Sequence, residues 1–315
     1  MAFRGLLGML IVSQLLVMNY ATSASAAPQL LQGAYSYVNC KTNFTASVVD
    51  QFIVLFPNHS GLVQNVSILQ QETGQLQDFA NQNNYTEFRN FYISVYMPEL
   101  NLIVNSLVTQ RKSANLSSSN ITALRNDYNY SKQQYDSCSF GALKTYAQGE
   151  IATYQGQVAS YQSIDSNLGQ RLGIDTGSLN QTLSGAQAQV IAPLQSALNS
   201  ATNTSQILKS FSSYCLFDGC QNGLNYHLDA KYYTQALGLG LGRLKQVPGL
   251  VNSSVVSTMQ GDISTASSAL NATGPSVYTT NESTEIYTSL DGAVLALKNA
   301  ILNYVHMKRS KGNTT

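Results

Sequence analysis

The sequence predicts an all-α fold, an elongated bundle of long antiparallel helices with coiled-coil-like packing, tied by disulfides. Apolar residues recur at steps of three and four along most of the chain, which is the spacing of one helix face. Strict alternation of apolar and polar residues, the pattern of a half-buried strand, is scarce. Pro57, Pro248 and Pro275 lie between the periodic segments, where proline belongs.

The heptad spacing is clearest in the segments 62–80, 121–138, 256–270 and 286–304. With the weaker patterns, these predict helices at 44–56, 61–81, 85–111, 117–171, 178–200, 204–217, 226–246, 252–271 and 283–308. Pro98 and Pro193 fall inside predicted helices and should kink or break them. The span 117–171 would be about 80 Å long if continuous. Its glycines favour a break near Ser139–Gly141.

The first residues predict a secretory signal peptide. Arg4 supplies a positive charge, an apolar segment runs from Leu6 to Met18, and Ala24-Ser25-Ala26 is a small-x-small cleavage pattern. We therefore expect a signal peptide at 1–26 and a single secreted helical-bundle domain at 27–315. The alternative is an uncleaved anchor, which needs nearer about 20 apolar residues.

The C-terminal stretch GAVLALKNAILNYVHMKRSKGNTT is interrupted by polar residues and ends basic. It matches neither a transmembrane tail nor a lipid-anchor signal. No other long apolar run occurs, so the mature chain is expected to have no transmembrane helix and to be secreted or held at the extracellular surface.

Asn-X-Ser/Thr glycan acceptors support export. The 27 Asn and 60 Ser or Thr would give about five such motifs by chance, fewer than the sequence contains. Twelve are expected to be glycosylated: Asn43, Asn58, Asn84, Asn115, Asn120, Asn129, Asn180, Asn203, Asn252, Asn271, Asn281 and Asn313. In the heptad register Asn129 faces solvent and Asn120 lies beside the helix start. Asn65 lies next to the apolar seam and is the first candidate for an unmodified acceptor.

Charged residues make up only 10% of the chain, against a usual value of about 25%. The net charge of +1 gives no basic surface for nucleic acid and no acidic tail. At low external pH carboxylates become protonated, and the remaining positive charges repel each other and destabilise a folded protein. A surface whose polar groups do not titrate avoids this repulsion and so suits an acidic environment. An acidic habitat is therefore a hypothesis, and compositional drift is the alternative.

Four cysteines in an oxidising compartment predict two disulfides, with three possible connectivities. We favour Cys40–Cys138 and Cys215–Cys220, because CLFDGC contains an Asp-Gly turn signal. Neither pair has the spacing of a zinc or redox site. No metal and no cofactor is expected.

Segments 130–179 and 204–251 contain no glycan acceptor. Because glycans shield a surface from protein contacts, these sequon-poor segments are where self-assembly or an extracellular protein partner would dock. The alternative is that they are simply the most buried elements. The run ALGLGLG at 236–242 suits close helix packing and lacks the spacing of a dinucleotide loop.

Motifs for catalysis are weak. GIDTGS at 173–178 resembles the active-site signature of aspartic proteases, but it occurs once and has helical flanks, so a helix-to-helix turn with Thr176 or Ser178 as N-cap is favoured. His227 near Asp229 lacks further metal ligands.

Tyrosines at helical spacing, such as Tyr154 and Tyr161, are more typical of a core than of a sugar-binding row.

These observations favour a secreted N-glycosylated helical protein with a cell-surface or extracellular structural or adhesion role. The alternative is a soluble extracellular binding module, either a receptor-like bundle or a carrier of an apolar ligand between helices. An enzyme ranks third, and we expect no catalytic activity.

Overall fold

The structure of the chain is a computed structural model. It describes residues 28–56, 60–113, 116–172, 175–211, 224–246, 252–273 and 280–312. The predicted signal peptide, the predicted Cys215–Cys220 pair and the side chain of His227 lie outside this part, as do the side chains of four expected acceptors, Asn58, Asn115, Asn281 and Asn313. All regular secondary structure in the described ranges is helical, so the all-α prediction is confirmed.

The first part of the chain forms α2 (Pro28–Leu55), α3 (Ser60–Asn81), α4 (Tyr85–Phe91), the π-helical segment η1 (Tyr92–Tyr96), α5 (Met97–Ser113) and α6 (Ser118–Leu172). The second part forms α7 (Gly177–Ala186), the π-helical segment η2 (Gln187–Ile191), α8 (Ala192–Ser200), α9 (Thr204–Ser210), α10 (Leu224–Lys245), α11 (Ser253–Thr273) and α12 (Thr280–Gly312).

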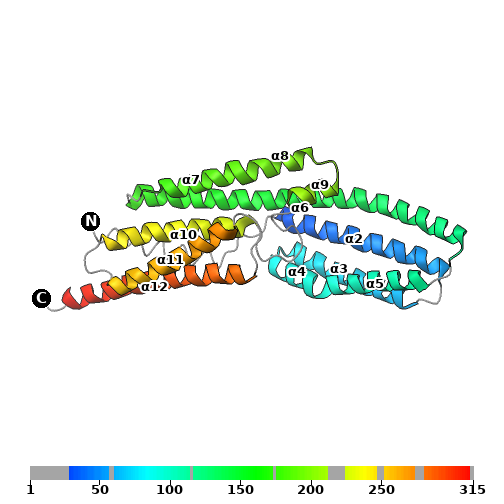
Figure 1. Cartoon of the computed structure of the whole chain (residues 1–315), viewed down its shortest axis with the longest axis horizontal. Coiled ribbons are helices and arrows are strands. Elements are labelled where there is room, and N and C mark those ends of the chain that lie inside the picture. The colour runs from blue at the N-terminus through cyan, green and yellow to red at the C-terminus, as the bar shows by residue number, and fades with distance from the viewer. Residues whose placement is uncertain are drawn as a thin grey trace.

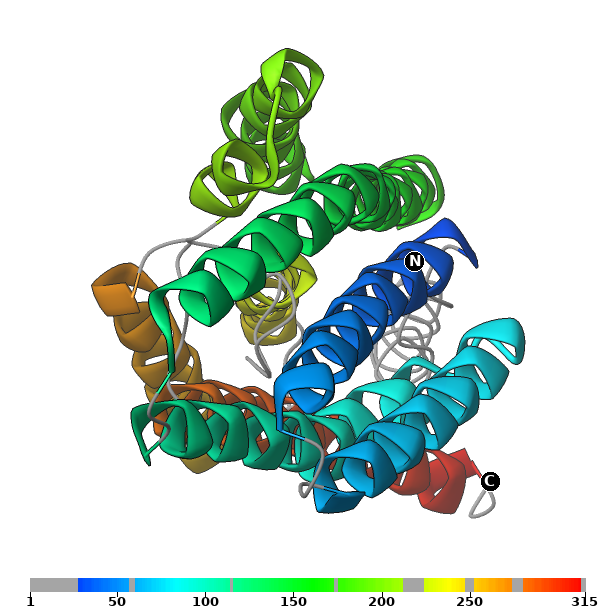
Figure 2. The same cartoon turned by 90° about the vertical axis from the view of Figure 1, so that its right-hand side faces the viewer.

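Helix α6 connects two groups of helices (Figure 1). Its first half lies with α2 to α5, and its second half lies with α7, α8 and α10 to α12. In the view down the long axis, α7 and α8 lie on one side of α6, and α2 to α5 lie on the other (Figure 2). Buried side chains from both groups form one hydrophobic cluster.

The heptad pattern predicts burial best in α3. All six predicted seam residues are buried there: Leu62, Val66, Leu69, Thr73, Leu76 and Ala80. The pattern at the start of α6 predicts it less well, because Ile121 and Tyr128 remain 43% and 44% exposed. Tyr128 instead lies at the edge of a ring cluster, with its centroid 5.7 Å from that of Phe44.

Helices α2 and α6 pack closely and run antiparallel. A Cβ at Gly149 of α6 would lie 2.6 Å from the Cα of Leu30, and a Cβ at Gly33 of α2 would lie 2.6 Å from the Cα of Tyr146. Each glycine therefore lets the other helix's backbone approach to a distance that no side chain would permit. Further along, the predicted Cys40–Cys138 disulfide joins the two helices, with the Cα atoms 5.8 Å apart.

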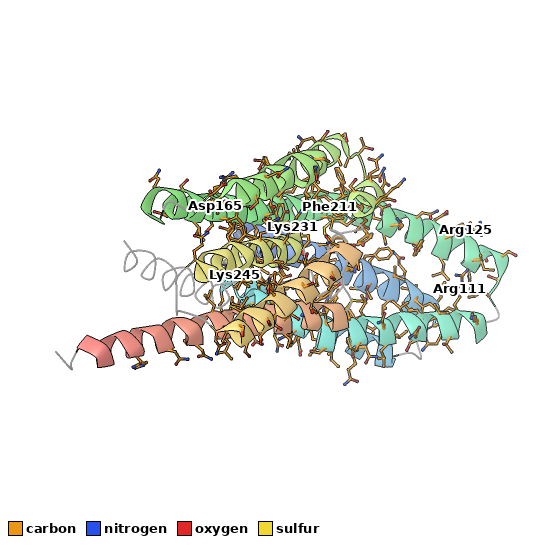
Figure 3. All side chains as sticks on the ribbon, turned by 60° about the vertical axis from the view of Figure 1, so that its left-hand side comes forward. Arg111, Arg125, Asp165, Phe211, Lys231 and Lys245 are labelled. Carbon is orange, nitrogen blue, oxygen red and sulfur yellow. A yellow bond between two sulfur atoms is a disulfide. The ribbon has the colours of Figure 1, made fainter. Side chains whose placement is uncertain are left out.

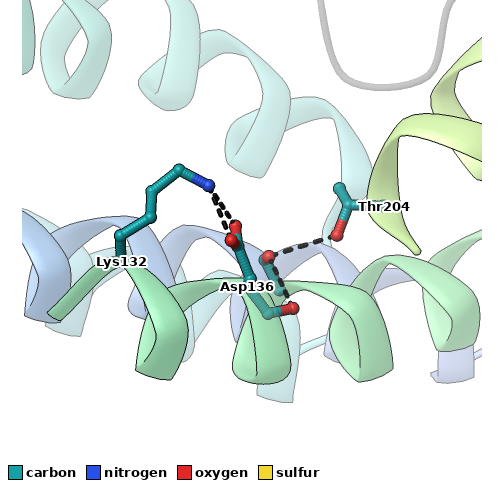
Figure 4. A network of polar contacts seen from close by, with 4 residues as sticks. Lys132, Asp136 and Thr204 are labelled. Atoms are coloured by element: carbon teal, nitrogen blue, oxygen red, sulfur yellow. Dashed lines mark hydrogen bonds and ion pairs between the residues drawn. The ribbon is translucent and has the colours of Figure 1, made fainter. Parts of the chain in front are cut away.

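Three predictions about helix boundaries were wrong. Helix α9 ends at Ser210, with Phe211 as its C-cap, rather than at residue 217. Helix α2 begins at Pro28 rather than at residue 44, because contact with α6 stabilises a segment whose own periodicity is weak. Helix α6 is continuous through Ser139–Gly141, where a break was expected. Ser139 is buried, and its hydroxyl group contacts both the carbonyl oxygen of Asp136 and the Thr204 hydroxyl of α9 (Figure 4).

Pro98 and Pro193 disturb their helices without ending them. Each follows a π-helical segment, η1 before Pro98 and η2 before Pro193. A proline ring clashes with the carbonyl group four residues earlier, which is Ser94 or Gln189 and lies inside that π-helical segment. The wider π turn accommodates the proline in a helix that otherwise continues.

Candidate functional site: the groove between α6, α7 and α10

A groove with a volume of about 650 Å³ lies between α6, α7 and α10. It includes parts of both sequon-poor segments, since α6 and α10 each supply lining residues. The lining consists of Tyr154, Ser178, Gln181, Thr182, Gly185, Ala186, Gln189, Val190, Leu228, Lys231 and Gln235. Its floor is apolar and buried, whereas its rim carries exposed amide, hydroxyl and ammonium groups.

The positions follow from helical spacing. On α7, Ser178, Thr182 and Gly185 repeat every three or four residues and so lie on one face. Leu228, Lys231 and Gln235 do the same on α10, where Figure 3 labels Lys231. Across the groove the Thr182 hydroxyl donates to Oε1 of Gln235 at 2.7 Å, which connects α7 to α10.

Helices α6 and α10, which both line the groove, are also joined by two tyrosine–carboxyl pairs. Gln157 and Tyr161 of α6 donate to Oδ1 of Asp229 on α10. Tyr232 of α10 donates to Oδ1 of Asp165 on α6 at 2.6 Å; Figure 3 labels Asp165. Each helix therefore supplies a carboxyl group to a tyrosine of the other. We refer to these five residues as the tyrosine–carboxyl cluster.

The cluster shows that α6 and α10 run parallel to each other, because higher numbers on one helix pair with higher numbers on the other. The described helices are therefore not antiparallel throughout. Tyr161 and Tyr232 stack with their centroids 4.0 Å apart, and Tyr233 lies edge-on to both rings.

Burial makes the cluster prefer uncharged groups. It raises the pKa of Asp229 to about 7, although the hydrogen bonds from Tyr161 and Gln157 act in the opposite direction. Burial also raises the pKa of Asp165, against the hydrogen bond from Tyr232. The pKa values of both tyrosines are raised by burial and by the carboxyl groups that they contact. Both tyrosines are therefore neutral donors at any physiological pH.

The predicted tyrosine row is part of the core. Tyr146, Tyr154 and Tyr161 are 5%, 3% and 3% exposed, so their ring faces are not available as a sugar-stacking platform. The sequence did not show that Tyr161 would meet a carboxyl group. The only local signal was the polar residue repeat at 157, 161 and 165, which places three side chains on one helix face.

GIDTGS lies at the connection between α6 and α7, of which 175–178 is described. Thr176 is the N-cap residue of α7, as predicted, but its side chain makes no capping bond. The carboxylate of Asp175 accepts from the Gly177 backbone N–H at 2.9 Å instead. The glycines at 236–242 lie inside α10, where Gly240 faces Leu297 of α12.

The glycan acceptors whose side chains are described lie at the surface. Asn43, Asn129, Asn180, Asn203, Asn252 and Asn271 are exposed, and Asn65, Asn84 and Asn120 are half-buried. Some hydroxyl residues of these acceptor motifs have internal partners. Thr182 bonds Gln235, and Ser131 bonds Ser47 and Gln51 of α2.

Three acceptor asparagines are also helix N-caps, which periodicity alone did not indicate. Oδ1 of Asn84 accepts from the Glu87 N–H at 3.2 Å. The same bond joins Asn203 to the Gln206 N–H at 3.0 Å and Asn252 to the Val255 N–H at 2.9 Å. An Asn directly before a periodic segment was the available signal.

Two kinds of feature are absent from the part of the chain that the structure describes. No group of three or more His, Cys, Asp or Glu side chains in these ranges could hold a metal ion. No helix within them is long and apolar enough to cross a membrane.

Comparison with known proteins identified no relative. No protein family, no curated protein and no solved structure matches this chain.

Proposed function

We propose that this chain is a secreted, N-glycosylated helical protein with an extracellular structural or adhesion role. In this proposal residues 27–315 form one elongated domain whose helices pack in coiled-coil fashion, and the domain contacts its partners through the sequon-poor segments. The proposed role is non-catalytic.

The distribution of acceptors over the surface is the observation that supports this proposal. Every described acceptor side chain is at least partly exposed, although apolar seams run through the same helices. Within the same structure, α6 from residue 130 onward and α10 expose polar side chains without any acceptor. Gln148, Gln155, Ser160 and Gln162 are exposed on α6, so this surface is not simply buried core. A glycan-free surface on a glycosylated protein is available for docking.

The test adds a glycan to the bare surface. Ser160→Asn with Gln162→Thr creates the acceptor Asn-Tyr-Thr at exposed positions of α6. Position 157 is unsuitable, because Gln157 belongs to the tyrosine–carboxyl cluster. Gln75→Asn with Gln77→Thr is the matched control, since it creates Asn-Leu-Thr at exposed positions of α3.

Both variants should be secreted and should gain one glycan by mass. Light scattering after size-exclusion chromatography, together with binding of the protein to cell surfaces, should then show loss of association for the α6 variant only. The proposal is wrong if the native chain is secreted without glycans, or if association survives when the new acceptor on α6 is fully glycosylated.

The groove favours a second candidate, a soluble extracellular binding module. Its volume lies within the range of about 300–1,000 Å³ that is typical of ligand sites. The rim argues against a carrier of apolar ligands, because Gln181, Gln189 and Lys231 are exposed around the opening. Thermal-shift measurements with fatty acids and with polar ligands would distinguish a carrier of apolar ligands from a module that binds polar ones.

A further inference from the structure

We propose that the groove between α6, α7 and α10 binds an oligosaccharide that carries a carboxylate group. The inference rests on the proposed extracellular adhesion role, and it names the chemistry that such a protein would recognise at its glycan-free surface.

Side-chain amides dominate the polar part of the groove. Gln181 and Gln189 approach it from α7 and η2, and Gln235 approaches it from α10. An amide presents a donor and an acceptor side by side, which matches two neighbouring hydroxyl groups of a sugar ring. Ser178 adds a hydroxyl group at the same rim. A ligand that offers many hydroxyl groups satisfies this set best.

Lys231 supplies the charge. Among the lining residues that the structure describes, it is the only charged side chain, and no carboxylate faces it from them. A cation at the rim, without a carboxylate in the lining, favours a ligand with a negative group. Because Lys231 is exposed, we expect this contact to set the preference between ligands rather than most of the affinity.

The groove has a fixed width and an apolar floor. The Thr182–Gln235 hydrogen bond holds α7 against α10, and it leaves the amide NH₂ of Gln235 available to a ligand. The floor includes Leu228 and Tyr154, which are 2% and 3% exposed, so it closes the groove from below and leaves recognition of a ligand to the polar rim.

The nearest acceptor is Asn180 on α7. Asn180 does not itself line the groove, whereas Gln181 and Thr182 of the same motif do. Gly185 also lines the groove, and a Cβ at this position would meet no atom within 4 Å. A larger side chain there would extend into open groove space without a clash.

The experiment is calorimetry on the mature glycoprotein with two tetrasaccharides. One alternates glucuronic acid with N-acetylglucosamine, and the other is the uncharged chitotetraose. We expect the acidic probe to bind about fivefold more tightly, which equals about 1 kcal/mol. Lys231→Gln should remove this preference, so that the two probes bind the variant equally tightly.

Gly185→Leu tests the location of the site. It should weaken binding of the acidic probe by at least about tenfold, which is about 1.4 kcal/mol. Gly261→Leu is the matched control, because Gly261 is an exposed glycine inside α11 with no atom within 4 Å of a Cβ. Both changes replace a helical glycine with a good helix former, so neither should impair folding.

The inference is overturned if neither probe binds at millimolar concentration, if both leucine variants lose binding equally, or if an acidic peptide competes as well as the acidic sugar. Failure of sugar binding is distinct from failure of the proposed function. In that case the chain would still be secreted, glycosylated and sensitive to the added glycan on α6.

Discussion

Tyr161 of α6 and Tyr232 of α10 stack with their ring centroids 4.0 Å apart, and each donates its hydroxyl proton to a carboxyl group on the opposite helix. This reciprocal exchange joins two helices that are distant in sequence. It also buries carboxyl groups, so the stability of the α6–α10 contact depends on pH.

The first prediction concerns Asp229. Burial raises its pKa in the folded chain to about 7, from an ordinary value of 3.8. The folded state therefore binds a proton more tightly than the unfolded state. This contribution to stability is fully present below about pH 3.8 and is lost as the pH rises to about 7, with an upper bound of about 4 kcal/mol. Urea unfolding at pH 5 and pH 8 should show the loss.

Asp229→Asn removes the titration and keeps the shape of the side chain. We expect this variant to have a smaller difference in unfolding free energy between pH 5 and pH 8 than the native chain. Asp175→Asn is a control, because Asp175 is exposed at the start of α7 and lies outside the cluster. Equal pH dependence of the native chain and Asp229→Asn would contradict the burial argument.

Other carboxyl groups respond in the same direction. Burial raises the pKa of Glu72, Glu150, Asp165, Asp229 and Asp291. The folded chain binds a proton at these groups more tightly than the unfolded chain does, so protonating them on acidification does not favour unfolding. This supports the hypothesis of an acidic habitat, under which the mature protein should keep its helical circular dichroism at pH 4.

The second prediction concerns the hydrogen bond from Tyr232 of α10 to Asp165 of α6. Tyr232→Phe removes the donor to Asp165, whose Oδ2 already has no hydrogen-bond partner. A buried carboxyl group that loses its donor should destabilise the chain by about 1–3 kcal/mol. Tyr130→Phe is the matched control, since Tyr130 is 65% exposed. Equal unfolding free energies for the two variants would mean that the Tyr232 hydrogen bond contributes nothing to stability.

The third prediction separates two glycines of α6. A Cβ at Gly149 would lie 2.6 Å from the Cα of Leu30, whereas a Cβ at Gly141 would meet nothing within 4 Å. Gly149→Ala should therefore destabilise the chain through overpacking, by about 1–3 kcal/mol. Gly141→Ala should stabilise it by up to about 1 kcal/mol, because alanine favours a helix interior. Thermal unfolding would measure both, and a stabilising Gly149→Ala would show that α2 and α6 are not in close contact.

The fourth prediction concerns the disulfide. Cys40 and Cys138 are 98 residues apart, and such a closure stabilises a chain by up to about 4.7 kcal/mol in the chain-entropy view. Replacing both by serine should lower the unfolding free energy by about 2–5 kcal/mol. Non-reducing peptide mapping of the native chain should find Cys40 joined to Cys138 and Cys215 joined to Cys220. A peptide joining Cys138 to Cys215 would contradict the predicted connectivity.

Sequence alone predicted the helices whose own apolar spacing determines which face is buried. Helix α3 is the clearest case, since its seam from Leu62 to Ala80 needs only one apolar face. The first half of α2 was missed because its helix depends on the close approach that Gly33 permits. A glycine looks like a helix breaker until the backbone that passes over it is known. The same reasoning applies to Gly149 in α6.

The candidate site was predictable only as a region. The absence of acceptors drew attention to 130–179 and 204–251, and the groove lies partly on both. Its amide lining forms no motif, because Gln181 and Gln235 come to line one groove only through the packing of α7 against α10. The tyrosine–carboxyl cluster is equally non-local, since Asp229 has no signal near it that points to Tyr161.

The last prediction concerns Asn252, an expected glycan acceptor that also caps α11. Its Oδ1 accepts from the Val255 N–H at 2.9 Å, while the glycan would be attached to Nδ2, so one side chain can serve both roles. Ser254→Ala should remove one glycan by mass and keep the cap. Asn252→Asp should also remove the glycan, and its carboxylate should keep the cap. Asn252→Gln should lose both and lower the unfolding free energy by about 0.5–2 kcal/mol more than Ser254→Ala. Equal stability of Asn252→Gln and Ser254→Ala would show that the cap is dispensable, and an unchanged mass for Ser254→Ala would show that Asn252 carries no glycan.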